Sequence, residues 1–395
     1  SYKYLYEGRT LDNVDTATLS GGLLILQGDA LFNNLAGATF DLQGDFTISA
    51  SQNDAIFNNL GTFVKTAGGG TAYLYPAFNN SGTVNGQAGI LGLYGGGSSS
   101  GAFQSSGANT LEFGSGTHTL TNASTVSGNV RVSGGTVEVN GDYDATSTTI
   151  TNGTLNLNAA SASTTTYTQS GGNRGGTGDL TVTGLLTWTG GFMRGVGHTI
   201  ADGGLSLSGT GYKYLYEGHI LDNAEMATLS EGLLVLQGDA VFNNLTDATF
   251  DIQGDYTISA SQNDATFNNA GTFIKSAGDS ISYMYPAFTN SGSVSVVSGE
   301  LRFNGGFSQS ATGVLHVQIG GLTPITDYDQ FIVTGQATLD GTLNVTLMGG
   351  FVPEPGDSFE VMTFNSRNGE FATVNGNGQD YIVNYTNTDV TLIAE

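Results

Sequence analysis

Short segments of the chain alternate apolar and polar residues with a period of two. Val137 and Val139 alternate with polar residues in one such segment, and Leu155 and Leu157 do so in another. This pattern is typical of β-strands that bury one face. Gly-Gly, Asn-Gly and Gly-Asp pairs separate the segments, and no stretch combines an apolar helical stripe with helix caps. The pattern therefore predicts an all-β protein.

The strand pattern is repeated at two scales. The motif YKYLYEG at residue 2 returns at residue 212, and this offset of 210 residues holds without a gap over residues 1–80 and 211–290. Inside each copy a Phe-Asn-Asn motif recurs at intervals of 25 and 21 residues. Its members begin at Phe32-Asn33, Phe57-Asn58 and Phe78-Asn79 in the first copy and at Phe242, Phe267 and Phe288 in the second, where Thr289 replaces one asparagine. Such a spacing is typical of one turn of a parallel β-solenoid.

We therefore expect a right-handed parallel β-helix, or β-solenoid. The phenylalanines stack inward from turn to turn, and the asparagines, which suit bends, form a structural ladder by bonding the equivalent residue one turn away. Three regions follow from the repeats: residues 1–210 are a first solenoid module and residues 211–311 a partial second copy. Residues 312–395, where prolines appear and the motif stops, form a C-terminal β-rich cap or a small β-domain.

Composition and charge exclude several classes of protein. The 395 residues include 61 Gly, 5 Pro and no Cys, and 10 basic residues face 34 acidic ones for a net charge of -24. Lys and Arg are too few for the basic patch that nucleic-acid binding requires. No apolar run approaches the roughly 20 residues of a membrane-spanning helix. We expect neither a nucleic-acid partner nor a transmembrane segment, and no disulfide or thiolate metal site.

The aspartates suggest a calcium site. Gln-Gly-Asp occurs twice in each copy, and a further aspartate follows one turn later; the residues are Asp29, Asp45, Asp54, Asp239, Asp255 and Asp264. If these turns stack, their carboxylates repel one another unless a cation such as Ca²⁺ bridges them. The alternative is a hydrated acidic surface that needs no ion. Both interpretations stay open, and no cofactor is required for either.

Tyrosines form a second repeated feature. Tyr4 and Tyr6 lie two residues apart, as do Tyr214 and Tyr216, so each pair shares one face of its strand. If the leucines between them point inward, the tyrosines form outward stripes that can contact a glycan ligand or a neighbouring solenoid. If the tyrosines point inward, they are core.

Catalysis is not expected. Acid pairs such as Asp41 with Asp45, or Asp142 with Asp144, arise by chance in an Asp-rich solenoid, and the basic residues are scattered singly. We therefore predict no catalytic residues. The alternative is a β-helix protein that binds or degrades polysaccharide, as a lyase, a hydrolase or a tailspike does.

Several segments resemble a known group of proteins. FNNLGTFVKTAGG, LTWTGGFMRG and DYDQFIVTGQATLDGTLNVTL are similar to the repeat arrays of large secreted bacterial surface proteins. These are the autotransporter-like and haemagglutinin-like parallel β-solenoids of cyanobacterial and planctomycete type. The resemblance implies a secreted protein, extracellular or at the bacterial cell surface, that serves as a matrix fibre, a filament or an adhesin stalk. Open solenoid ends further predict a homo-oligomer or a head-to-tail filament.

Overall fold

The structure is a computed structural model that describes residues 2–51, 54–261 and 264–395. Every regular element in these residues is a β-strand, and none of them forms a helix, let alone one suited to span a bilayer. The parallel strands stack as a β-solenoid of about 15 turns, which confirms the predicted fold class. Two compact units are present: unit 1 comprises Ser1–Gly184 and Arg194–His198, and unit 2 comprises Leu185–Met193 and Thr199–Glu395. The predicted divisions after residues 210 and 311 stay a prediction.

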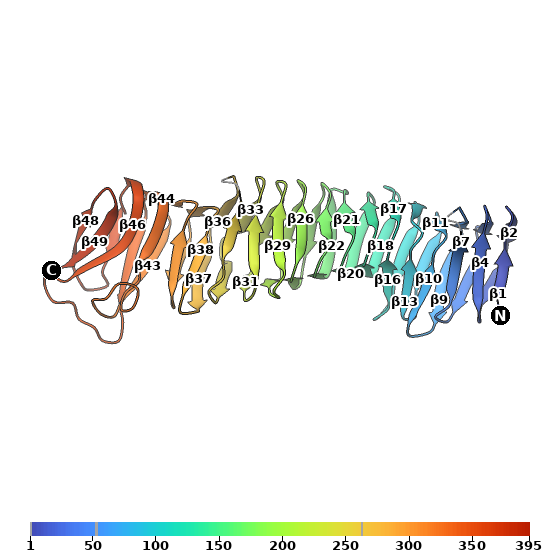
Figure 1. The fold of residues 1–395 in the computed structure, drawn as a ribbon, viewed down its shortest axis with the longest axis horizontal. Coiled ribbons are helices and arrows are strands. Elements are labelled where there is room, and N and C mark those ends of the chain that lie inside the picture. Colours follow the sequence, from blue (N-terminus) through green and yellow to red (C-terminus); the bar gives the residue numbers. More distant parts are fainter. Residues whose placement is uncertain (1, 52–53, 262–263) are drawn as a thin grey trace. The chain divides into compact units, whose positions relative to one another are not determined.

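Unit 1 consists of three ladders of short parallel strands, because each early turn contributes three strands (Figure 1). The first ladder contains β1 (Tyr2–Leu5), β4 (Leu23–Gln27), β7 (Thr47–Ser51), β10 (Thr71–Leu74), β13 (Ile90–Leu93) and β16 (Thr110–Phe113). The second contains β2 (Thr10–Asn13), β5 (Leu31–Asn34), β8 (Ile56–Asn59) and β11 (Ala77–Asn80), followed by β14 (Gly97–Ser99), β17 (Thr117–Leu120), β19 (Thr136–Val139), β21 (Thr154–Leu157) and β23 (Asn173–Gly175). The third contains β3 (Thr16–Leu19), β6 (Thr39–Gln43), β9 (Thr62–Ala67), β12 (Thr83–Gly86), β15 (Ala102–Ser105) and β24 (Asp179–Val182).

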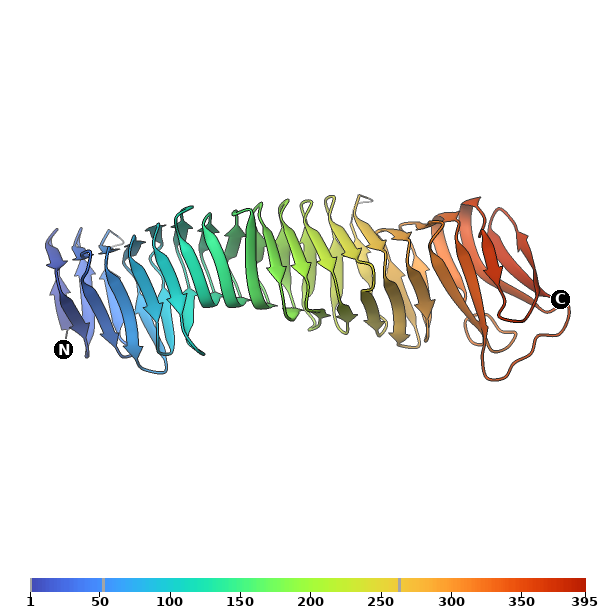
Figure 2. The same cartoon turned by 180° about the vertical axis from the view of Figure 1, so that it is seen from behind.

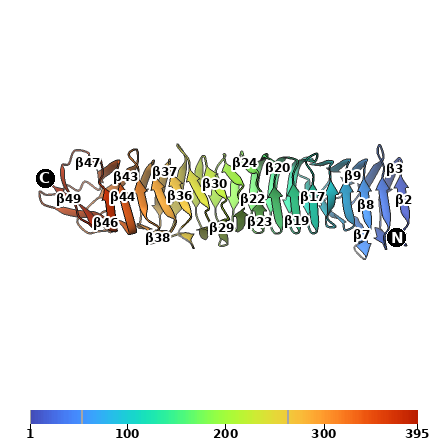
Figure 3. The ribbon, with the colours of Figure 1, turned by 90° about the horizontal axis from the view of Figure 1, so that it is seen from above.

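Three longer strands join the third ladder to the first in the later turns of unit 1. They are β18 (Thr125–Val132), β20 (Asp142–Ile150) and β22 (Ser161–Gln169). β18 pairs with β15 through its first residues and with β16 through its last, so the corner between the two ladders is lost. Figure 3 shows β17 and β19 of the second ladder in neighbouring turns.

Unit 2 repeats this arrangement. Its first ladder contains β29 (Tyr212–Tyr216), β32 (Leu233–Leu236), β35 (Ile258–Ala260), β38 (Ile281–Met284), β41 (Glu300–Phe303) and β44 (Phe331–Leu339). Its second contains β30 (Ile220–Asn223), β33 (Val241–Asn244), β36 (Thr266–Asn269), β39 (Ala287–Asn290) and β42 (Phe307–Gln309). Its third contains β25 (Leu186–Trp188), β28 (Leu205–Leu207), β31 (Met226–Leu229), β34 (Thr249–Gln253), β37 (Thr272–Ala277), β40 (Ser293–Val296), β43 (Val314–Ile319), β45 (Thr342–Leu347) and β47 (Thr373–Asn375). β26 (Gly191–Arg194) and β27 (His198–Ala201) each contain residues of both units.

Antiparallel strands follow the solenoid turns in unit 2. β46 (Ser358–Gly369) pairs in parallel with β44 and antiparallel with β49 (Asp389–Ala394), and β49 pairs antiparallel with β48 (Tyr381–Tyr385). These strands are red in Figure 2 and lie at the end of unit 2 that holds the C-terminus. They form the predicted C-terminal β-rich cap. The third ladder continues in parallel past residue 312 through β43, β45 and β47.

Stacked phenylalanines fill the core in the early turns of unit 1 and in the matching turns of unit 2, because in-register pairing places equivalent side chains directly above one another. In unit 1 the rings of Phe32 and Phe57 stack at 4.6 Å, and those of Phe40 and Phe63 stack at 5.2 Å. The two stacks meet edge to face, with Phe40 5.3 Å from Phe57. Unit 2 repeats both stacks, including Phe242 on Phe267 at 4.7 Å. Edge-to-face and offset contacts of this kind stabilise aromatic cores beyond the area that they bury.

Glycines, which have no Cβ atom, allow successive turns to approach closely at the corner between the second and third ladders. A Cβ atom on Gly61 would lie 2.2 Å from the carbonyl oxygen of Ala38, and one on Gly82 would lie 2.0 Å from that of Gly61. The corner repeats at Gly101, 2.1 Å from the oxygen of Gly82. The spacing of the turns therefore requires glycine at this corner.

Gly82→Ala should lower the free energy of unfolding of unit 1 by about 1–3 kcal/mol, because the added methyl group overlaps a main-chain oxygen that cannot move away. Thermal and urea unfolding measure the change. Gly21→Ala is the matched control, since a Cβ there has no neighbour within 4 Å. Equal unfolding midpoints for the two variants would contradict the close approach.

Candidate functional site

Buried asparagines form a continuous amide ladder inside unit 1. The Nδ2 group of Asn13 donates to Oδ1 of Asn34 at 2.7 Å, Asn34 donates to Asn59 at 2.7 Å, and Asn59 donates to Asn80 at 2.8 Å. All four side chains are buried. Each of the first three amides also donates its other hydrogen to a main-chain carbonyl of the third ladder, at 2.9–3.1 Å. The ladder thus satisfies buried polar groups and ties the second ladder to the third.

Unit 2 contains the same inner ladder. The amides of Asn223, Asn244 and Asn269 each donate to the next member at 2.8 Å, and Asn290 donates to Gln309 at 3.0 Å. Glutamine continues the series at its last step because it has the same amide group on a longer side chain.

The predicted ladder residues lie one position away from this inner ladder. Asn33, Asn58 and Asn79 point outward from the strands, where Asn58 donates to Asn33 and Asn79 donates to Asn58, both at 3.0 Å. They lie in β-strands and not in bends, contrary to the prediction. The inner residues, the second asparagines of each motif, were missed. The period of two was the available signal, since a residue two positions after an inward phenylalanine also points inward.

A buried lysine pairs with one of the predicted calcium ligands. The Nζ group of Lys65, whose side chain is fully buried, lies 2.9 Å from Oδ1 of Asp45. It also donates to the carbonyl oxygens of Ala67, Gly68 and Ala88 at 3.0, 2.8 and 2.7 Å. The hydrogen bond from Lys65 lowers the pKa of Asp45, against a smaller opposing effect of burial. An ammonium group of the chain itself therefore lies beside Asp45, one of the six aspartates predicted to bind calcium.

The second copy repeats this pair, with Lys275 Nζ 3.0 Å from Oδ1 of Asp255. The other predicted aspartates, Asp29, Asp54, Asp239 and Asp264, are exposed. Among residues 2–51, 54–261 and 264–395, no three His, Asp or Glu side chains gather closely enough to hold a metal ion. Calcium binding stays a prediction.

The tyrosine stripes lie on the outside of the sheet. Tyr4 and Tyr6 are 56% and 49% exposed, while Tyr214 and Tyr216 are half-buried. The leucine between the second pair, Leu215, is fully buried, so the tyrosines occupy the outward face. Of the two arrangements that the alternation allowed, the structure has the outward one.

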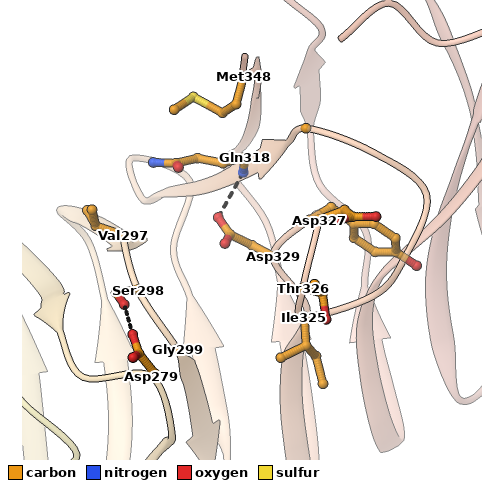
Figure 4. Close-up of a pocket in the computed structure, with 12 residues that line it drawn as sticks. Asp279, Val297, Ser298, Gly299, Gln318, Ile325, Thr326, Asp327, Asp329 and Met348 are labelled. Atoms are coloured by element: carbon orange, nitrogen blue, oxygen red, sulfur yellow. Dashed lines mark hydrogen bonds between the residues drawn. The ribbon is translucent and has the colours of Figure 1, made fainter.

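Acidic residues line a pocket of about 570 Å³ in unit 2, which the sequence did not predict (Figure 4). Burial raises the pKa of Asp329 to about 7, although Asp329 Oδ2 accepts a hydrogen bond from the main-chain N–H of Gln318 at 2.8 Å. Asp327 Oδ2 accepts the N–H of Thr323 at 3.0 Å, and hydrogen bonds from Thr323 lower its pKa. Both carboxylates thus hold the connection between β43 and β44 in shape.

Comparison with known proteins gave no match, either to a protein-family model or to a curated protein. The solenoid fold is shown by the structure, and membership of the bacterial repeat-array group stays a prediction.

Asn59→Ala should lower the free energy of unfolding by at least about 2 kcal/mol, because it leaves one buried amide hydrogen of Asn34 unpaired and removes the hydrogen bonds that Asn59 donates to Asn80 and to the main chain of Thr83. Urea unfolding measures the loss. Asn58→Ala is the matched control on the outer face, where water can replace the amide, and it should cost less than about 1 kcal/mol. If Asn58→Ala were the more damaging change, the inner ladder would not be the main polar support.

Asp329 should make unit 2 less stable as the pH rises. Its pKa in the folded protein, about 7, lies above its usual value of 3.8, so folding favours the protonated form. The stabilisation is complete below about pH 4 and is lost as the pH rises through about 7. Asp329→Asn should remove this dependence and slow amide exchange in the β43–β44 connection at about pH 8. Identical pH dependence in the variant and the parent would exclude Asp329 as the cause.

Proposed function

We propose that the chain is a non-enzymatic structural protein of the bacterial cell surface or extracellular matrix, in which the β-solenoid acts as a stalk or fibre. The observation that carries this proposal is the inner amide ladder, which continues from turn to turn beside the stacked phenylalanines. In such a core the buried amide groups hydrogen-bond to those of the neighbouring turns and so hold the turns together. A repeated scaffold with this core is suited to bear load and to present its outer faces.

The main-chain hydrogen bonds support the same role. Consecutive turns pair largely in register along most of each ladder, and the early turns of unit 1 are joined on all three sides of the solenoid. Separating two turns requires several hydrogen bonds to break together, along with the amide ladder and the aromatic stacks. This bonding pattern supports the proposed mechanical function of a stalk or fibre.

Head-to-tail assembly into an oligomer or a filament is part of this proposal. Edge strands of a solenoid accept strands from another solenoid, and a second copy of the chain can provide them. Leu11 of β2 is 42% exposed and lines a pocket of about 240 Å³ together with mainly apolar side chains, so it suits a test of this association.

Leu11→Lys should shift the chain from oligomers to monomers, because the charge would have to be buried in the joined edge. Sedimentation velocity at increasing concentration measures the association, and electron microscopy shows whether it yields filaments. Leu60→Lys, at a residue that is 43% exposed, is the matched control and should leave association unchanged. A parent chain that stays monomeric at high concentration would rule out the assembly part of the proposal while leaving the structural role to be tested at the cell surface.

Polysaccharide binding is a second candidate function, and an aromatic cluster on the outer face favours it.

A further inference from the structure

Three tyrosines form a compact cluster on the outer face of the first ladder in unit 1. Tyr73 lies in β10, Tyr75 follows that strand, and Tyr94 follows β13 in the next turn. The rings of Tyr73 and Tyr75 are nearly parallel, 6.0 Å apart at 16°. The ring of Tyr94 lies 5.4 Å from each of them, inclined at 62° and 47°. The three rings therefore form an aromatic corner, to which we refer as the tyrosine corner.

The tyrosine corner is pre-formed because Tyr94 rests on bare backbone. A Cβ atom on Gly92 would lie 2.8 Å from the ring of Tyr94, and one on Gly114 would lie 2.2 Å from it. Glycine at both positions lets the ring lie against the sheet. A ring that is already in place loses little conformational entropy when a ligand binds.

A buried carboxylate fixes the hydroxyl end of Tyr94. The hydroxyl group donates to Oε1 of Glu112 at 3.2 Å, and Glu112 is only 6% exposed. Ser133 also donates to Glu112, and Arg131 Nη1 lies 4.0 Å from its Oε2. Burial and the negative charge of Glu112 raise the pKa of Tyr94, so the phenol stays protonated and keeps donating. The orientation of Tyr94 is thus set by a charged network behind it.

The face beside the tyrosine corner is polar and regular. Tyr73, Gly92 and Glu112 are in register across β10, β13 and β16, three strands that Figure 1 labels in unit 1. Arg131, Thr149 and Thr168 continue the same row across β18, β20 and β22. An apolar corner followed by a row of hydroxyl groups and one guanidinium matches a ligand with both an apolar face and many hydroxyl groups.

We propose that the tyrosine corner binds a neutral polysaccharide, with pyranose rings stacked on Tyr75 and Tyr94 and sugar hydroxyl groups directed to the polar row. This binding goes beyond the structural role proposed above and does not depend on it. A pyranose ring has an apolar C–H face that suits an aromatic ring, and its hydroxyl groups suit phenol, threonine and guanidinium partners. The net charge of -24 opposes a polyanionic ligand.

The size of the cluster favours a sugar over a protein partner. Tyr75 is 44% exposed and the other two rings are half-buried. Three partly buried tyrosines offer a few hundred Å² at most, well below the roughly 800 Å² that each side of a standard protein interface buries. One or two sugar rings match that area.

The second copy provides an internal comparison. Tyr283 and Tyr285 retain the first two rings, 6.0 Å apart, but Asn304 stands where the first copy has Tyr94. Arg302 replaces Gly92, and its Nη2 group is held 3.1 Å from Oε2 of Glu300. Tyr94 and the glycine beneath its ring, Gly92, thus occur together in the first copy, and the second copy has neither of them.

Binding of the full chain to cellulose, mannan, starch and chitin tests the proposal, by pull-down for the insoluble polymers and by affinity electrophoresis for the soluble ones. The parent chain should bind at least one of them. Tyr75→Ala and Tyr94→Ala should each weaken this binding about tenfold or more, the loss expected when an aromatic anchor is removed. Tyr285→Ala, the matched change in the second copy, should leave the affinity unchanged.

Two further variants separate binding from folding. Tyr94→Phe keeps the ring but loses the bond to Glu112, so it should bind more weakly than the parent and more tightly than Tyr94→Ala. Tyr94→Asn combined with Gly92→Arg introduces at these two positions the residues that the second repeat carries, and it should abolish binding. The proposal is overturned if none of the four polymers binds, if Tyr75→Ala and Tyr94→Ala bind as the parent does, or if polygalacturonate binds more tightly than the neutral polymers.

Discussion

In-register stacking of the turns is the constraint on which the rest of the structure depends. Once strands of successive turns pair residue by residue, every inward position meets its own equivalent above and below. A side chain is then tolerated in the core only if it can pack against the side chains at the equivalent positions of the neighbouring turns. Phenylalanine does so by stacking, as Phe32 does on Phe57. Asparagine does so because one amide both donates and accepts, as Asn34 does between Asn13 and Asn59.

The same constraint explains which parts of the fold could be predicted from the sequence. The recurrence of phenylalanine predicted the solenoid, because an apolar residue repeated at the length of one turn has no other simple explanation. The first asparagine of each motif was assigned to a ladder, and it does bond its equivalent one turn away, but the second, buried asparagine was not singled out. Asn34 is buried only because a neighbouring turn supplies its partners, and a residue read by itself does not show that.

The charged residues show a second limit of sequence-based prediction. Spacing placed Asp45 and Asp255 each in a repeated turn of its own copy, and repulsion between stacked carboxylates gave a reason for a bridging cation, with a hydrated acidic surface as the alternative. The cation that the structure supplies to each is a buried lysine, Lys65 or Lys275. The sequence shows that these two lysines recur at equivalent positions, but it does not show that they are buried. An ammonium group is buried only where carbonyl oxygens surround it. That arrangement is a property of the folded corner.

The two copies also show how one chain can keep a core and still change a surface. An inward side chain packs against side chains of the turns on both sides. A substitution in one turn therefore requires residues in the neighbouring turns that still pack against it. Outward positions meet solvent, and a substitution there is limited only by what lies beside it on the sheet. The outward residues Gly92 and Tyr94 of the first copy correspond to Arg302 and Asn304 of the second. The inward residues Leu91 and Leu93 correspond to Leu301 and Phe303, which are also apolar and buried. A duplicated solenoid can therefore acquire a ligand site on one copy without altering the turns that carry it.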